Sequence, residues 1–302
     1  MKGYFDAVTS VLDTNNLRGS IPNAITTLSS LQWLYMKTNR LTSTIPESIG
    51  DLVHLQGIVM NANQIEGTIP QSIGKLRNLQ ILTLSVNKLT GTIPLSMNNL
   101  TNLRTLEMHY NKLNGTLHLD PSKFNRLKML MLQSNELSGE FVSSLGTGFQ
   151  NIELLFLGSN KLNGTISTSI STLSKLHIFD LSNNTLHGNV PQQIWDMKNM
   201  EIFGLGDNDL SGSIPNDIGK MSLLKVFSIE NNNFRGLLPS MVGNLNQLKL
   251  LSINSNHFTG SIPSSIGNIE ELQALQMGDN FFNGTLPKSI LNNRKLGELT
   301  CL

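Results

Sequence analysis

The chain repeats one arrangement of apolar and polar positions about every 24 residues. An Asn returns at steps of 24, with one step of 25, and the residues around it keep their type. Leu, Met or Ile stands three positions before each Asn, and Leu, Ile or Phe stands two positions after it. Just before the Asn, runs such as Leu34-Tyr35-Met36 alternate apolar and variable residues, which predicts a short strand with one buried face. The twelve asparagines in phase are Asn15, Asn39, Asn63, Asn87, Asn111, Asn135, Asn160, Asn184, Asn208, Asn232, Asn256 and Asn280.

Stacking of coils explains why these residue types recur. One 24-residue coil cannot bury its own apolar face, but neighbouring coils stacked on it form a continuous core. An Asn side chain carries both a carbonyl and an NH₂ group, so it can satisfy backbone donors and acceptors of adjacent coils. A buried unsatisfied polar group costs roughly 1–3 kcal/mol. We therefore expect this asparagine ladder to be buried, hydrogen-bonded between coils and structural in its role.

A Gly-x-Ile-Pro phrase follows the Asn in many copies, as in Gly212-Ser213-Ile214-Pro215. Gly admits backbone conformations that a Cβ resists, and Pro lacks the N–H that a central strand needs. The phrase therefore predicts an extended run at a sheet edge. Apolar residues after it, such as Ile218 and Met221, predict a short helical turn that points inward.

The complete phrase, L-x-x-L-x-x-L-x-L-x-x-N-x-L-x-G-x-I-P, resembles the plant-type leucine-rich repeat along essentially the whole chain. That family includes receptor-kinase ectodomains, receptor-like proteins and inhibitors of cell-wall-degrading polygalacturonases. The resemblance implies an α/β fold: a right-handed solenoid with a curved parallel sheet on its concave face and short helical or 3-10 turns on its convex face. It also implies binding of proteins, peptides or glycans on the concave face, and an extracellular or cell-surface location.

Two functions remain open from this resemblance. The first is recognition of a protein or peptide ligand by a receptor-like cell-surface protein in signalling or defence, with a co-receptor as a further partner. The second is soluble inhibition of a secreted hydrolase by covering its active site. A membrane span downstream would favour the receptor, and a short capped C-terminus would favour the inhibitor.

Residues 1–302 are expected to form one leucine-rich-repeat domain of about twelve repeats, with an incomplete thirteenth at residues 294–302. Leu296, Leu299 and Cys301 fall in the core columns of that last repeat, and Ala7 and Ser10 occupy core columns of a weak first coil. Repeat arrays need polar caps over their terminal cores. We therefore expect the chain to be a fragment of a longer protein.

Repeats five to seven depart from the repeated phrase. Leu117-His118, Phe141-Val142 and Ile166-Ser167 replace Ile-Pro there, and the one insertion falls at residues 143–151. Either a tolerant loop has drifted, or the break marks a binding surface, as breaks often do. Aromatic, Met and charged side chains at the variable strand positions resemble interface anchors. The candidate ligand-binding residues are Arg104, Glu107, His109, Tyr110, Met131, Gln133 and Phe156, with a second group at Trp33 and Tyr35.

Charge and cysteine content narrow the class of function. Lys and Arg total 22 and Asp and Glu total 21, so the net charge of +1 gives no reason to expect nucleic acid or an anionic membrane surface as a partner. Cys301 is the only cysteine, which excludes an internal disulfide and a cysteine zinc site. No stretch approaches the ~18 apolar residues of a membrane span. The first residues also lack the apolar core of a signal peptide.

Motifs for catalysis are missing from the sequence. It contains no phosphate-binding loop, zinc-protease motif, nucleophile elbow or kinase signature. His109 and Glu107 share a strand face, but no motif places a Ser or Cys nucleophile with them. We therefore expect no enzyme activity, cofactor or metal.

Five Asn-x-Ser/Thr sequons are candidate glycosylation sites. They arise either from the repeat phrase itself or from passage through the secretory pathway. The missing signal peptide argues against the second explanation for the sequence as given. The five are Asn99, Asn114, Asn163, Asn183 and Asn283.

Overall fold

The computed structural model describes residues 9–300 of the chain. These residues divide into two compact units, one of residues 9–141 and 147–152 and the other of residues 142–146 and 153–300. This division falls at the insertion in the repeat. Ala7 and Cys301, both expected in core columns, lie outside the described residues. That residues 1–302 form a single domain stays a prediction.

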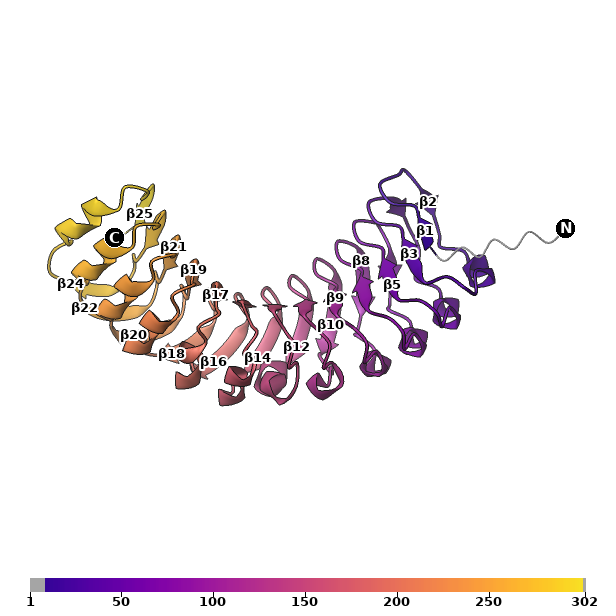
Figure 1. Ribbon diagram of the computed structural model, residues 1–302, viewed down its shortest axis with the longest axis horizontal. Coiled ribbons are helices and arrows are strands. Elements are labelled where there is room, and N and C mark those ends of the chain that lie inside the picture. Colours follow the sequence, from indigo (N-terminus) through magenta and orange to yellow (C-terminus); the bar gives the residue numbers. More distant parts are fainter. Residues whose placement is uncertain (1–8, 301–302) are drawn as a thin grey trace. The chain divides into compact units, whose positions relative to one another are not determined.

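Each unit is a solenoid in which every coil adds one strand to a parallel sheet (Figure 1). Strands pair in register at the repeat period, so that Leu82 lies opposite Leu106. The first unit contributes β1 (Thr9–Val11), β3 (Trp33–Tyr35), β5 (Gly57–Val59), β7 (Ile81–Thr83), β9 (Thr105–Glu107) and β11 (Met129–Met131). The second contributes β13 (Leu154–Phe156), β15 (Ile178–Asp180), β17 (Ile202–Gly204), β19 (Val226–Ser228), β21 (Leu250–Ser252), β23 (Ala274–Gln276) and β25 (Glu298–Thr300). We call the solvent-facing side of these strands the strand face.

A second row of short parallel strands follows the ladder asparagines, where the sequence predicted only an extended run. In the first unit these are β2 (Arg18–Gly19), β4 (Arg40–Leu41), β6 (Glu66–Gly67), β8 (Lys88–Gly91), β10 (Lys112–Thr116) and β12 (Glu136–Gly139). In the second unit they are β14 (Lys161–Gly164), β16 (Thr185–Asn189), β18 (Asp209–Gly212), β20 (Asn233–Leu237), β22 (His257–Ser261) and β24 (Phe281–Asn283).

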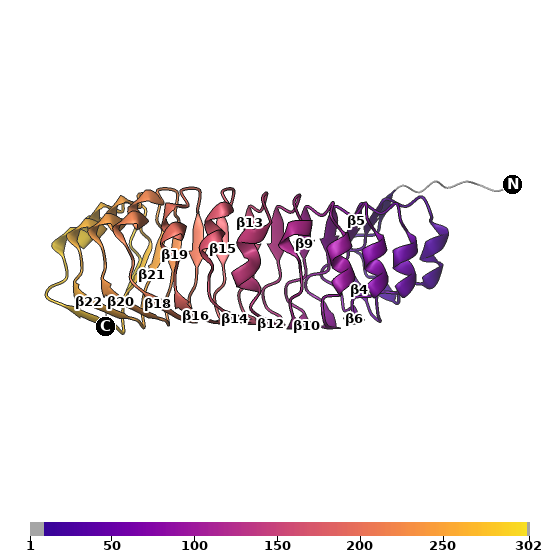
Figure 2. The same ribbon diagram turned by 90° about the horizontal axis from the view of Figure 1, so that it is seen from below.

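Short 3-10 helices cover the side of each unit opposite the strand face (Figures 1 and 2). Most begin directly after a Pro in an extended conformation, such as Pro70 with φ −67°, because Pro fixes φ and cannot donate to a sheet. Gly74 packs so closely on the next coil that a Cβ there would overlap the Ser96 carbonyl. The helices are η1 (Asn23–Thr27), η2 (Glu47–Asp51), η3 (Gln71–Lys75), η4 (Leu95–Asn99), η5 (Pro121–Lys123), η6 (Phe141–Thr147), η7 (Thr168–Thr172), η8 (Gln192–Asp196), η9 (Asn216–Lys220), η10 (Ser240–Asn244), η11 (Ser264–Asn268) and η12 (Lys288–Asn292). The predicted fold class, a solenoid of parallel strands and short 3-10 turns, is confirmed.

The asparagine ladder joins each coil to the one before it. Asn232 is 6% exposed, and its Oδ1 accepts from the Leu210 backbone N–H at 2.9 Å. Its Nδ2 donates to the Leu205 carbonyl of the preceding coil at 2.9 Å and to the Ile229 carbonyl of its own coil at 3.2 Å. The same pattern recurs at Asn39, Asn63, Asn87, Asn111, Asn135, Asn184, Asn208, Asn256 and Asn280.

Asn15 departs from the expectation that every ladder asparagine is buried. It is exposed, and its Nδ2 donates to the Leu12 and Asp13 carbonyls of its own coil and to no other group of residues 9–300. Several others, including Asn63 and Asn208, are half-buried. Hydrogen bonding between coils, more than complete burial, is therefore what the ten ladder positions described above share.

The insertion is packed by aromatic side chains. Phe149 is fully buried in the first unit and lies 6.1 Å from Phe124 and 6.3 Å from Phe141, measured between ring centroids. Gly148 approaches Pro121 so closely that a Cβ would overlap its backbone. The residues inserted in this repeat therefore serve to pack the core.

The residue before each ladder asparagine adopts a left-handed backbone conformation. Val86 does so with φ 54°, although its side chain is β-branched. The side chain is 47% exposed, so core packing does not require a Val there. Asn183 and Asn231 fill the same position in later coils with φ 52° and 50°. Left-handed φ strains most side chains by about 1–2 kcal/mol, and least those of Gly and Asn.

We predict that Val86→Asn stabilises the protein by about 0.5–1 kcal/mol, because Asn tolerates the left-handed conformation that Val resists. Urea unfolding measures the change. Lys88→Asn, at an exposed position with ordinary φ, is the control and should be neutral or destabilising. Loss of stability in Val86→Asn would contradict the strain argument.

Replacing a ladder asparagine should weaken the joint between coils. Asn232→Ala leaves the Leu210 N–H and the Leu205 carbonyl without partners, and we expect it to cost more than about 2 kcal/mol in urea unfolding. Asn15→Ala is the matched control, and its cost should stay below about 0.5 kcal/mol because the hydrogen bonds that Asn15 makes with residues 9–300 lie within its own coil. Equal losses in the two variants would refute the role of the ladder.

Candidate functional site

The predicted ligand-binding residues lie on or beside the strand face, since they alternate with buried residues such as Leu34, Leu106 and Leu130. Arg104 and Tyr110 are exposed, whereas the others are half-buried. In the first unit, β3, β9 and β11 carry or adjoin Trp33, Tyr35, Arg104, Glu107, His109, Tyr110, Met131 and Gln133. Phe156 lies on β13 of the second unit and is described there separately.

Trp33 and Tyr35 form one aromatic surface on β3. Their rings are nearly parallel, with centroids 6.0 Å apart and an interplanar angle of 6°. The Trp33 ring lies over Gly57 on β5. It occupies the space that a side chain at position 57 would need. The sequence predicted the pair but not the glycine that makes room for it.

Polar atoms without partners gather around β9 and β11. His109 Nδ1 and Gln133 Oε1 are buried and have no hydrogen-bond partner, and among residues 9–300 only Asn293 Oδ1 shares that property for a side chain. His109 and Gln133 occupy the same position of adjacent coils, two residues before Asn111 and Asn135. Because an unpaired buried polar atom costs roughly 1–3 kcal/mol, this site favours a ligand that supplies hydrogen bonds.

Burial also shifts two titrating groups beside these atoms. Desolvation raises the pKa of Glu107 above its ordinary value and lowers the pKa of His109 below its own. Tyr110 is 58% exposed and meets the His109 ring edge-on, with centroids 5.4 Å apart. An acid, an imidazole and a phenol therefore adjoin an open surface. We call Glu107, His109, Tyr110, Met131 and Gln133 the central patch.

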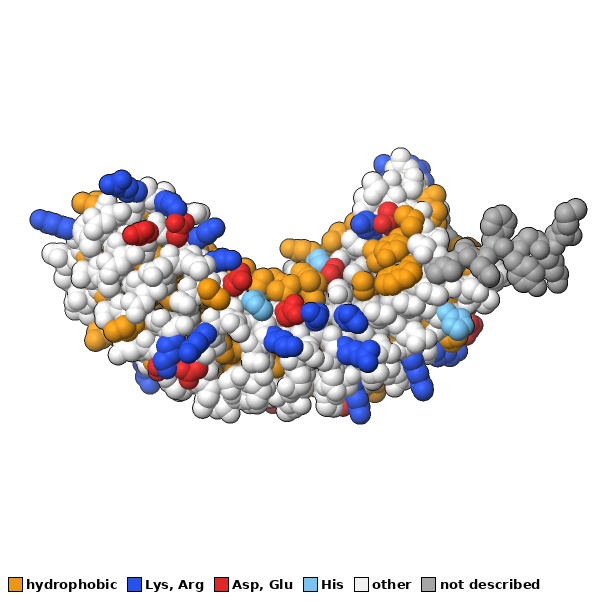
Figure 3. Space-filling model, in the orientation of Figure 1, with side chains coloured by type: hydrophobic (Ala, Val, Ile, Leu, Met, Phe, Trp, Pro, Cys, Tyr) orange, Lys and Arg blue, Asp and Glu red, His pale blue; other side chains and the backbone are white. Residues whose placement is uncertain are grey.

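The second unit carries an apolar row on its strand face that the sequence analysis missed. Its members stand one position before a core residue in each coil and pair in register across the sheet. All are half-buried, and Figure 3 shows apolar and charged side chains along the strand side of each unit. Aligning that position in every repeat would have revealed Leu154, Ile178, Ile202, Val226, Leu250 and Ala274.

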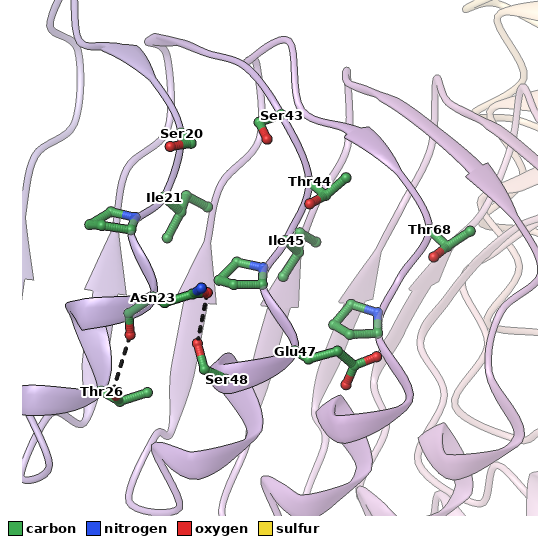
Figure 4. Close-up of a pocket in the computed structure, with 13 residues that line it drawn as sticks. Ser20, Ile21, Asn23, Thr26, Ser43, Thr44, Ile45, Glu47, Ser48 and Thr68 are labelled. Atoms are coloured by element: carbon green, nitrogen blue, oxygen red, sulfur yellow. Dashed lines mark hydrogen bonds between the residues drawn. The ribbon is translucent and has the colours of Figure 1, made fainter.

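A wide hollow lies away from the strand face. Figure 4 shows it between successive Ile-Pro segments of the first unit, where Ser48 donates to Asn23 at 3.4 Å. Its volume is about 810 Å³, and Glu47 is its only ionisable lining residue. It therefore offers no acid–base pair for catalysis. Among residues 9–300, no group of three or more metal-ligating side chains is present.

The candidate glycosylation sites and the helices were each compared with what the sequence predicts. Asn99, Asn114, Asn163, Asn183 and Asn283 are all exposed, so each is accessible to a glycan. Within the described part of the chain, no helix has the length and apolar character to cross a bilayer.

Comparison with known proteins finds one matching family model and many similar solved structures. The family model described as "Leucine-rich repeat region" matches residues 7–194 and 159–302. The plant peptide hormone receptor RGFR1, solved in complex with RGF2, is 33% identical over 97% of this chain and 47% of its own, with a TM-score of 0.91. A TDR receptor is 28% identical over 97% of this chain and 55% of its own, with a TM-score of 0.83.

A third similar structure is the Arabidopsis receptor kinase HAESA ectodomain with an N-terminally extended IDA peptide hormone. It is 28% identical over 97% of this chain and 57% of its own, with a TM-score of 0.81. This chain therefore spans about half the length of the solved receptors it matches. No curated protein matches the chain.

The pKa shift of His109 predicts how pH acts on stability. Because the folded-state pKa lies below the unfolded value, the folded protein binds fewer protons, and stability falls as pH drops through and below about 6.5. Glu107 acts oppositely at lower pH, since its raised pKa favours folding as it protonates. We expect His109→Gln to lose less stability than the wild type between about pH 7.5 and about pH 5.5, measured by urea unfolding. Identical losses would show that His109 is not desolvated.

Proposed function

The chain belongs to the leucine-rich-repeat family, and from that premise we propose that it binds a peptide or protein ligand through its strand face. The binding segment would serve a receptor-like protein at the cell surface. It would hold the ligand without catalysing a reaction. The central patch, which lies within the first unit, would make the main contacts.

Similarity to peptide-binding receptors supports the proposal. RGFR1 was solved with RGF2, HAESA with an IDA peptide and PEPR1 with AtPEP1, and each match covers 97% of this chain. Exposure of all five sequons is compatible with an extracellular glycoprotein.

The observation that carries the proposal is the pair of unpaired buried atoms, His109 Nδ1 and Gln133 Oε1. They belong to adjacent coils, whose strands lie about 4.8 Å apart. An extended peptide presents backbone N–H and C=O groups at a similar repeat, so one segment can pair with both side chains once they rotate toward the strand face. Tyr110 next to them provides an amphipathic ring of the kind that dominates binding energy at interfaces.

We predict that Tyr110→Ala weakens ligand binding by about 2 kcal/mol, or about thirtyfold in Kd. Phe156→Ala, on β13 of the second unit, is measured with the same ligands. Isothermal titration calorimetry against a panel of synthetic secreted peptides, with RGF2 and IDA included, would find the ligand and measure both changes.

Phe281→Ala is the matched control. Phe281 is an aromatic residue with 63% exposure, and it lies on β24, outside the strand face. Its replacement should leave Kd unchanged. Equal losses at Tyr110 and Phe281, or a loss confined to Trp33→Ala and Tyr35→Ala, would place the ligand elsewhere. Failure of every peptide to bind would contradict peptide recognition.

A further inference from the structure

A groove of about 400 Å³ follows the edge of the strand face in the first unit. Its lining comprises three glutamines, two asparagines, one histidine and two arginines, without a single Asp or Glu. The two arginines are Arg104, just before β9, and Arg126, in the next coil. The groove is therefore polar along its length and cationic at one end.

The amide side chains of the groove are already hydrogen-bonded. Gln56 Nε2 donates to Gln32 Oε1 at 3.0 Å, and Gln80 Nε2 donates to Gln56 Oε1 at 3.2 Å. Asn78 and Asn102 donate to backbone carbonyls of the preceding coils at 3.1 and 2.8 Å. These bonds hold the neutral wall of the groove in a fixed shape.

Unlike these amide side chains, the two guanidinium groups have no side-chain partner among residues 9–300. Among residues 9–300, neither Arg104 nor Arg126 has a carboxylate within ion-pair distance or a side-chain hydrogen bond, although other cations such as Lys220 and Lys225 are paired. Both arginines are exposed. Two unneutralised arginines facing one groove repel each other, and each presents a planar set of donors that matches a carboxylate or sulfate.

We propose that this groove binds an anionic group of the ligand, a carboxylate or a sulfate, held between Arg104 and Arg126. The identity of that ligand rests on the proposed function, but anion binding at the groove does not depend on it. Arg104 precedes the strand that bears Glu107, so the anion site adjoins the central patch. A ligand bound at both places carries an acidic group beside the segment that reaches His109 and Gln133. The two arginines also orient the ligand, because both lie at one end of the groove.

Anion titration tests the proposal without a known ligand. Arginine Nε–Hε NMR signals are followed while sodium sulfate, or the tripeptide acetyl-Glu-Glu-Glu, is added at constant low ionic strength, with sodium chloride and acetyl-Gln-Gln-Gln as references. Low salt is needed because exposed charges are screened within about 10 Å at 0.1 M. We expect the Arg104 and Arg126 signals to move together and saturate with sulfate, with the acidic tripeptide or with both. Whichever of sulfate and the acidic tripeptide binds with the lower Kd identifies the anion that the groove prefers.

The R104Q/R126Q variant should bind the anion at least tenfold more weakly, whereas R235Q, an exposed arginine on β20 of the second unit, should bind it as the wild type does. R104K/R126K keeps the positive charges and loses the planar donors. Its affinity for the anion should therefore lie between those of R104Q/R126Q and the wild type. Equal shifts with chloride, or equal affinity in R104Q/R126Q and R235Q, would overturn the anion site. A ligand peptide with an acidic group that binds the wild type and R104Q/R126Q equally would also overturn the proposal while leaving the proposed function intact.

Discussion

Hydrogen bonds from one asparagine per coil hold the rest of the structure in place. From Asn39 onward, ten of these side chains accept from a backbone N–H and donate to a backbone carbonyl of the coil before, as Asn111 does with Leu89 and Leu84. These bonds fix the step between coils, and the strands then pair in register. Since the backbone is satisfied in this way, the outward residues of each strand are free to vary without loss of the fold. The strand face can therefore carry recognition at little cost in stability.

The fold was predictable because its signals repeat. A single Leu34 or Asn39 says little, but the same residues at a fixed step identify the buried columns, the strand and the turn. The second row of strands was not predicted as a sheet, because Gly and Pro in the phrase argue against pairing there. Packing of Phe149 into the core of the first unit was also hidden, since the insertion breaks the period that identifies inward positions.

The candidate site was only partly predictable, because its decisive properties belong to pairs of residues from different coils. Strand alternation put His109 and Gln133 on the strand face, but only the structure shows that one atom of each is buried without a partner. Arg126 stands outside the strand, and its relation to Arg104 becomes visible once the two line one groove. The aromatic surface of Trp33 likewise depends on Gly57 in the next coil. Sequence periodicity locates positions, whereas contacts between coils decide what those positions can bind.

The most direct test of ligand recognition by the strand face is a crystal structure of the protein with a bound peptide. The account predicts that the peptide lies across β9 and β11, and that its backbone or side chains supply partners at about 3 Å to His109 Nδ1 and Gln133 Oε1. A peptide seated instead in the Ile-Pro hollow of Figure 4, with both atoms still unpaired, would contradict the account.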